Sequence, residues 1–379
     1  MDQNGWIAKA NAASAVLSRH SGNVDETGRW PAESMAALAE SGLLGLAVPK
    51  DFGGAGGTPA VFVSVVSTLA EKCASTAMIY LMHVCATQVI AQAAGFPWRE
   101  RILREIASGK HLSTLAFSEK GSRSHFWAPV SQVVLQGDSH VLSADKSWVT
   151  SAGHADSYVV VTRSAKAAAL TDSTLYYVPK DAAGLSSKGT YNGLGLRGNA
   201  SAPMRLEGVA LSASHRMTED GAGFPLMMSA VLPWFQIGAA AVSLGIARAA
   251  IEGIRGHLFA SKLEHLGQSL ADLMNLRARL AQMKIAADTT QAFLFDVCRR
   301  METNDPSAML GVLESKAAAG EMALQVTDLA MRVGGGAAFS KHLTVERNFR
   351  DARAAAVMAP TSDVLHDFIG KAILDMPLF

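Results

Sequence analysis

The segment HVLSADKSWVTSAGHADSYVVVTRSA, residues 140–165, decides the fold class. It holds two short runs rich in β-branched and aromatic residues, bounded by Gly, Asp and Ser, which is typical of strands and not of a helix. Similar runs, STLYYVPK and PMRLEGVAL, follow it, and the Gly-Asp pair at 137–138 suits a hairpin that joins two strands. Residues 113–218 therefore predict a small β domain of barrel or sandwich type.

The chain is helical on both sides of this β domain. Residues 1–112 carry apolar side chains at three- and four-residue spacing in WPAESMAALAESGLLGL, and the turn-rich VPKDFGGAGG ends that helix. Residues 219–379 contain three long stretches with helical periodicity and a short last helix that begins near Thr361, which together are typical of a four-helix bundle. The predicted fold class is α+β, with an N-terminal all-α domain, a central β domain and a C-terminal helical bundle.

The composition excludes several classes of protein. Hydrophobic residues make up 49% of the 379 and charged residues 18%, so the chain can bury a substantial core and is not disordered. The net charge of +1 gives no support for a nucleic-acid or anionic-membrane partner. Three separated cysteines exclude a disulfide scaffold, no residues have the spacing of a metal-ligand set, and no signal peptide or membrane span is apparent. We expect a soluble, cytoplasmic protein without a metal site.

Two turns next to the predicted strands suit a cofactor site. LAFSEKGSRSHFWAPVSQV, residues 115–133, offers hydroxyl and backbone N–H groups to an anionic or polar ligand, although a loop between two domains uses such groups for its own hydrogen bonds. Trp148 and Thr150 end a strand, where an indole beside small hydroxyls would form one wall of a site for a ring-shaped cofactor. An aromatic core residue capped by a turn is the alternative interpretation.

Other candidate residues are titratable. VERNFRDAR follows a glycine-rich bend and carries Arg350, which faces either Asp351 or a phosphate. His83 lies among apolar residues, where a histidine is usually a hydrogen-bonded core residue. Asp363 and His366 share one face of the last helix, as a catalytic pair or as an ordinary surface contact. These patterns alone do not establish a function.

Five segments, in this order, resemble the acyl-CoA dehydrogenase superfamily over nearly the whole chain. GLLGLAVPKDFGGAG is similar to an early helix and turn of that family, LAFSEKGSRS to its TEPxxGSD signature, and KSWVTSAGHADSYVVVTR to its KxWITNxxxADxxVV strand pair. GLGLRGNASAPMRLEGVAL and GGGAAFSKHLTVERNFRDAR are similar to two later signatures. Each motif is weak alone, but their order and spacing coincide with the boundaries found from periodicity. The resemblance therefore implies the same three-part fold.

The resemblance also implies a flavin, usually FAD with FMN as the alternative, between the β domain and the bundle. The residues it assigns to this cofactor are Phe117 and Ser118 against the ring, Ser124 at the pyrophosphate, Trp148 over the flavin face, Thr150 near the N5 edge, Gly335 and Gly336 of a neighbouring subunit at the adenine half, and Thr361 nearby. It further implies a homotetramer or dimer, with an electron-transfer flavoprotein or a flavin reductase as partner.

The chain departs from the family where the chemistry is expected. In the family a glutamate before the Gly-Thr of the last helix removes the α-proton of the thioester, and the matching residues here are Ala359 and Pro360. Some members carry this glutamate on the first bundle helix, where the present chain has Phe235. Neither a methyl nor a phenyl group accepts a proton. Loss of a general base typically costs about 10²–10⁴-fold in rate, so a replacement or a different reaction is required.

The missing glutamate leaves three hypotheses. The first is a dehydrogenase of an acyl thioester, carried by CoA or a carrier protein, with a base from elsewhere, in descending order Asp363, His366 or His83. The second is a class D flavin-dependent monooxygenase, which uses reduced flavin and O₂, needs no such base and is suited by a dry cavity. The third is a non-catalytic relative that keeps the flavin site as a binding module. The family base rate favours the first hypothesis, and the missing glutamate counts against it.

Overall fold

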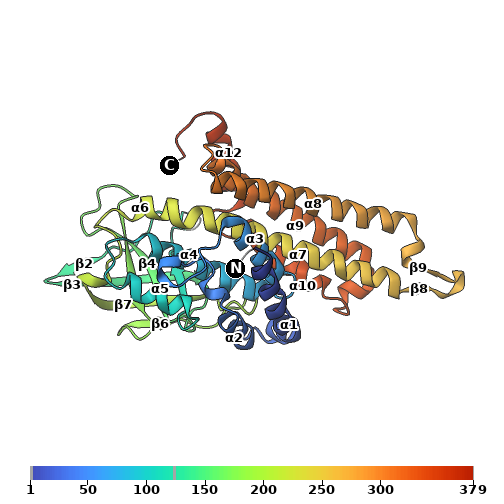
Figure 1. Cartoon of the computed structure of the whole chain (residues 1–379), viewed down its shortest axis with the longest axis horizontal. Helices are drawn as coiled ribbons and strands as arrows, with labels where there is room; N and C mark the ends of the chain where they lie inside the picture. The colour runs from blue at the N-terminus through green and yellow to red at the C-terminus, as the bar shows by residue number, and fades with distance from the viewer. Residues whose placement is uncertain (1–2, 123–124, 379) are drawn as a thin grey trace.

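The computed structural model describes residues 3–122 and 125–378 (Figure 1). Its N-terminal part is helical, as predicted, with α1 (Gln3–Thr27), α2 (Ala32–Glu40), α3 (Pro59–Ala70), α4 (Ala74–Gln92) and α5 (Arg99–Ala107). Pro59 occupies the first position of α3, where its missing N–H costs no helix hydrogen bond. Most side chains of α3 and α4 are buried, because other helices cover both of them and β1 also covers α4.

Two sheets form the central part. β1 (Ser113–Ala116) pairs in parallel with β4 (Ser157–Arg163), which pairs antiparallel with β5 (Ser173–Pro179). The second sheet is antiparallel, with the order β2 (Val134–Gln136), β3 (Ser139–Val149), β7 (Ala202–Ser212) and β6 (Leu185–Ser187). Side chains of both sheets, among them Leu142 of β3 and Val160 of β4, share one buried cluster. This arrangement confirms the predicted β domain.

The predicted hairpin at 137–138 is present between β2 and β3. Gln136 pairs with Ser139, so Gly137 and Asp138 form a two-residue turn. Gly137 has a φ of 58°, a left-handed conformation that glycine adopts without a steric penalty.

The C-terminal part is a helical bundle that extends away from the β domain (Figure 1). It begins with α6 (Gly223–Leu226) and a π-helical turn, Met227–Val231, which lead into α7 (Leu232–Ala260). A small hairpin, β8 (Lys262–Leu263) with β9 (Gln268–Ser269), connects α7 to α8 (Met274–Glu302). The chain then returns through α9 (Ala308–Phe339), on which α10 (Val345–Ala352), α11 (Ala354–Val357) and α12 (Ser362–Ile373) pack. The last helix starts directly after Thr361, as predicted.

Two apolar helical segments are long enough to cross a membrane, but both lie in the core. They are α4 and residues 223–260, and 94% and 89% of their most apolar windows are buried. Glycines allow neighbouring helices to approach α7 closely, since a Cβ on Gly238 would lie 2.2 Å from the Leu81 side chain and one on Gly245 would lie 2.4 Å from the Ser67 carbonyl oxygen. Their burial fits the soluble protein expected from the composition.

Candidate functional site

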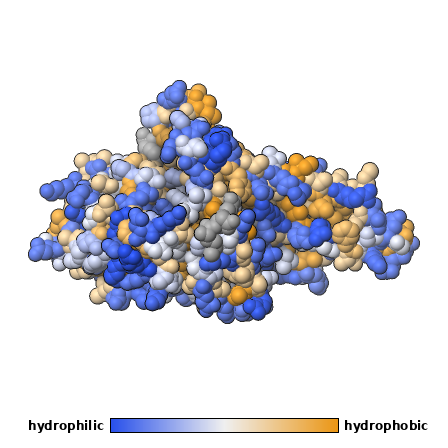
Figure 2. All heavy atoms as spheres, in the orientation of Figure 1, coloured by the Kyte–Doolittle hydropathy of each residue, from blue (hydrophilic) through white to orange (hydrophobic). Residues whose placement is uncertain are grey.

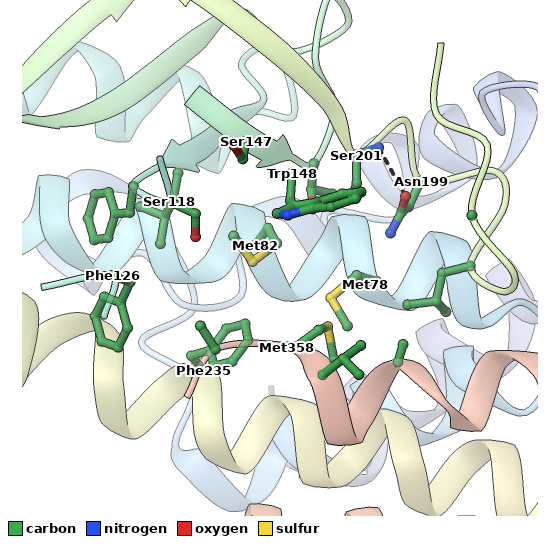
Figure 3. Close-up of a pocket in the computed structure, with 18 of the residues that line it drawn as sticks. Met78, Met82, Ser118, Phe126, Ser147, Trp148, Asn199, Ser201, Phe235 and Met358 are labelled. Carbon is green, nitrogen blue, oxygen red and sulfur yellow. Dashed lines mark hydrogen bonds between the residues drawn. The ribbon is translucent and has the colours of Figure 1, made fainter. Parts of the chain in front are cut away.

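A cavity of about 1040 Å³ lies where the β domain, α4, α7 and the segment 354–361 meet (Figure 3). One wall is apolar and comes from three separate elements. Met78 and Met82 belong to α4, Phe235 to α7, and Met358 and Ala359 to the segment before α12. The two positions at which the family resemblance places a catalytic glutamate, 235 and 359, therefore both line this cavity.

Trp148 forms the opposite wall with an uncovered ring. The pairing of β3 with β7 shifts register between Lys146 and Val149, and such an irregularity redirects the side chain at that point. Trp148 has a φ of 57° and is 69% exposed although it lines the cavity, and Figure 3 shows its indole across from Phe235 and Met358. A large aromatic ring with a free face suits a flat ligand that stacks on it.

Neutral polar groups lie beside Trp148. The Thr150 hydroxyl is 3.0 Å from the Ser201 hydroxyl, and the backbone N–H of Ser201 donates to the Asn199 side-chain oxygen at 3.1 Å. All three residues are buried and line the cavity. They offer hydrogen-bond donors and acceptors without bringing a charge.

Glu119 lines the cavity but its carboxylate is fully engaged. It pairs with the Lys146 ammonium at 2.5 Å and accepts backbone N–H groups from Val130 and Ser131, both at 2.7 Å. Burial raises the pKa of Glu119, but the Lys146 charge and the hydrogen bonds outweigh it and hold this pKa below the ordinary value. The pair ties the loop that follows β1 to β3, and the carboxylate is not available as a base.

The structure does not bring His83 to the cavity. His83 is fully buried, its Nε2 lies 3.1 Å from the Leu44 carbonyl oxygen, and its Nδ1 accepts the backbone N–H of Ser113 at 3.2 Å. Burial lowers the pKa of His83 to about 4. Both ring nitrogens form hydrogen bonds with backbone groups, so neither is free to abstract a proton. His83 is therefore a hydrogen-bonded core residue.

The structure does not bring Asp363 and His366 to the cavity either. Both are exposed on α12. The Nε2 of His366 lies 3.0 Å from a carboxylate oxygen of Glu321 on α9, so its ionic partner is not Asp363. All three predicted replacement bases therefore lie outside the cavity lining.

The predicted cofactor residues are mostly brought together. Phe117, Ser118, Trp148, Thr150 and Thr361 all line the cavity, whereas Ser124 lies outside the described residues.

Gly335 and Gly336 stand apart from these residues, near the end of α9, and do not line the cavity. Gly335 interrupts the helix with a φ of 53°, and a Cβ at either glycine would meet nothing within 4 Å in this chain. Their place at a neighbouring subunit's cofactor stays a prediction.

The loop 191–201 is a part of the site that sequence reasoning missed. Arg350, expected to face Asp351 or a phosphate, instead pairs with Asp25 at 2.6 Å and donates to the Leu194 carbonyl oxygen at 3.1 Å. Asp351 accepts the backbone N–H of Leu196. These contacts join positions more than 150 residues apart, and nothing local in the sequence signals them.

Comparisons with known proteins agree with this architecture. Three domain models of acyl-CoA dehydrogenase match the chain, the N-terminal domain over 9–110, the middle domain over 114–209 and the C-terminal domain over 221–374. The probable acyl-CoA dehydrogenase YngJ of Bacillus subtilis (strain 168) is 27% identical over 365 residues, which cover 96% of this chain and 95% of that protein. Butyryl-CoA dehydrogenase from Megasphaera elsdenii superposes with a TM-score of 0.93 at 22% identity, covering 99% of this chain and 100% of that one. The FAD complex of PigA superposes with a TM-score of 0.90 at 17% identity over 99% and 100% of the two chains.

Proposed function

Because the chain belongs to the acyl-CoA dehydrogenase family, we propose that it is a flavin-dependent oxidoreductase whose cavity holds FAD. The free ring face of Trp148 and the buried hydroxyls of Thr150 and Ser201 fit a flavin ring. PigA, which has the same fold, is described with FAD. The flavin would supply two-electron chemistry, and the protein supplies the binding, the orientation and the exclusion of water.

We infer that the reaction is a monooxygenation. The observation that carries this inference is that no described residue lining the cavity offers a free proton acceptor of the kind that α-proton abstraction requires. The carboxylate of Glu119 is engaged, and Ala359 and Phe235 carry no acceptor.

A monooxygenation has no need of such an acceptor. The substrate, O₂, two electrons and two protons give an oxygenated product and one water. One oxygen atom forms the new bond to the substrate and the other leaves as water. A separate reductase would supply the two electrons by reducing the flavin. The apolar side chains of Met78, Met82, Phe235 and Met358 line the cavity, and a low water content there would limit unproductive side reactions.

Dehydrogenation of an acyl thioester is the second candidate, supported by the named activity of relatives such as YngJ. It requires a base that reaches the cavity. Asp363 and His366 follow the lining residue Thr361 on α12, so the segment 358–362 would have to rearrange to deliver either of them. In this case the electrons would pass from the flavin to an electron-transfer flavoprotein. A non-catalytic flavin-binding relative is the third candidate.

The deciding experiment follows the visible spectrum of the FAD-loaded protein while acyl-CoA thioesters of increasing chain length are added without oxygen. We expect the oxidised flavin band to persist. Bleaching would overturn the monooxygenase, and Asp363→Asn and His366→Gln would then locate the base. If the band persists, substrate-dependent oxygen consumption with a flavin reductase supports the monooxygenase, and its absence across a broad panel of substrates supports the non-catalytic relative.

We also propose that the protein acts in the cytoplasm as a homotetramer or dimer. Its three cysteines are free and buried, as suits a reducing compartment. Figure 2 shows apolar side chains among charged ones over the bundle, and Met274, Ile285 and Phe339 are exposed there. Such residues favour subunit contacts. Light scattering on the eluted protein would give the mass, and a monomer at micromolar concentration would contradict this proposal.

A further inference from the structure

Lys316 of α9 is a buried cation. The residue is 2% exposed, and no ion pair joins it to a carboxylate in the described part of the chain. Its Nζ instead donates to three carbonyl oxygens, those of Ala355 at 3.2 Å, Met358 at 3.0 Å and Pro360 at 2.7 Å. An ammonium group has three N–H donors, so each of them has one acceptor.

The charged form of Lys316 is the one that matches this arrangement. Burial lowers the pKa of Lys316 to about 7, because an ammonium loses its hydration when it leaves water. The three carbonyl dipoles act in the opposite direction and favour the ammonium, which alone can donate to all three. A buried charge is costly unless such partners are present.

The three acceptors belong to one short stretch, which consists of α11 and the irregular chain after it and which borders the cavity. α11 ends at Val357, Met358 has extended backbone, and α12 begins only at Ser362. The carbonyls of Met358 and Pro360 lie between these helices, where no helix or sheet ladder holds them, and the carbonyl of Ala355 lies in the short helix α11. Met358, Ala359 and Thr361 nevertheless form part of the cavity wall. Lys316, which belongs to α9, donates hydrogen bonds to all three of these carbonyl oxygens.

We propose that Lys316 is a positioning residue that fixes the cavity wall 354–361 and thereby sets the size of the molecule that the cavity accepts. This inference goes beyond the proposed function, since it holds for a monooxygenase and for a dehydrogenase alike. Ala359 lies between Met358 and Pro360, whose carbonyls Lys316 binds. Lys316 therefore fixes the backbone at position 359, where this chain has alanine and not glutamate. Lys316 itself does not line the cavity and acts only through the segment.

The test compares Lys316→Met, which keeps an unbranched side chain as far as the ε position and removes the ammonium, with Lys371→Met on α12. Lys371 pairs with Asp367 at 2.9 Å, and its side chain is 32% exposed. Two quantities are measured on the FAD-loaded proteins. One is amide hydrogen exchange of residues 354–361. The other is the dissociation constant of each 1-alkanol from butanol to decanol, read from the flavin spectrum.

For Lys316→Met we expect exchange of residues 354–361 to become about ten-fold faster, since hydrogen bonds to a charged group are lost. The best-bound alkanol should bind about ten-fold more weakly and the preference for one chain length should flatten. The Lys371→Met protein should behave as the wild type does. Unchanged exchange together with unchanged alkanol affinities in Lys316→Met would overturn the proposal.

Lys316→Ala provides a second measurement that separates the ammonium from the volume of the side chain. Propylammonium fills the space left by the lysine and restores the three hydrogen bonds, whereas 1-propanol fills it without the charge. We expect propylammonium alone to restore slow exchange, or to restore folding if the variants are unfolded without it. Equal rescue by propanol, or no rescue by either compound, would show that Lys316 does not position the wall through its ammonium.

Discussion

Asp351 of α10 accepts a hydrogen bond at 2.6 Å from the backbone N–H of Leu196, which lies 155 positions earlier in the chain. Leu196 has a left-handed φ of 51°. At the neighbouring Gly195, a Cβ would lie 2.5 Å from the carbonyl oxygen of Arg350, so only glycine allows this approach. Through these contacts α10 holds the loop 191–201 at the cavity without itself lining it.

Replacing Asp351 by Asn should change the pH dependence of stability. Burial raises the pKa of Asp351 to about 6, although the Leu196 N–H and Arg347 oppose the shift. The folded state thus binds this proton more tightly than the unfolded state does. The contribution of protonated Asp351 to the free energy of unfolding is fully present below about pH 4 and is lost as the pH rises through about 6.

Urea unfolding between pH 4 and pH 7.5 measures this contribution. We expect the free energy of unfolding of the wild type to fall, relative to Asp351→Asn, by up to about 3 kcal/mol across this range. The exposed Asp138→Asn should follow the wild type. Parallel curves for the wild type and Asp351→Asn would contradict the assignment.

Trp148→Ala should weaken FAD binding. The indole has a free face in the cavity, and stacking of aromatic rings contributes about 0.5–1.5 kcal/mol, which corresponds to a dissociation constant about 2- to 10-fold higher. Trp148→Phe, which keeps a smaller aromatic ring, should have a dissociation constant for FAD between those of the wild type and Trp148→Ala. Titration of the flavin-free protein with FAD, followed by flavin fluorescence, measures the constants, and equal values for the three proteins would remove Trp148 from the cofactor site.

Thr150→Val should slow the reaction of the bound flavin by roughly ten-fold, the effect of about one strong hydrogen bond. The substitution keeps the shape of the side chain and removes the hydroxyl that lies 3.0 Å from Ser201. Stopped-flow reduction and reoxidation of the flavin measure the rates. Thr303→Val, at an exposed helix end, is the matched control. Rates equal to those of the wild type would show that the hydroxyl does not act on the flavin edge.

Ala359→Glu should bring a proton acceptor into the cavity, because Ala359 lines it. If a thioester fits the site, anaerobic bleaching of the flavin by acyl-CoA should rise by about 10²-fold or more. Ala359→Gln has nearly the same volume but no basic oxygen, so it should give no gain. The absence of a gain for Ala359→Glu at every acyl chain length would indicate that the natural substrate is not a thioester.

The succession of helical, β and helical parts could be predicted because hydrophobic period and turn chemistry depend on residues a few positions apart. The hairpin at Gly137 and the start of α12 after Thr361 are examples. The same local pattern predicted Trp148 and Thr150 as cavity residues, since they lie at and just after the end of a strand that residues 140–165 reveal. Their role toward FAD remains to be measured.

The sequence by itself determined the domain order, the strand that carries Trp148 and the lack of a glutamate at positions 235 and 359. Only the tertiary structure decided which side chains meet. In the folded chain His83, Asp363 and His366 lie outside the cavity. The Glu119 carboxylate pairs with Lys146, and the Lys316 ammonium donates a hydrogen bond to the Met358 carbonyl oxygen. These outcomes depend on contacts between elements far apart in the chain, and on which groups lose their water when the elements pack. Neither is encoded in the spacing of neighbouring residues.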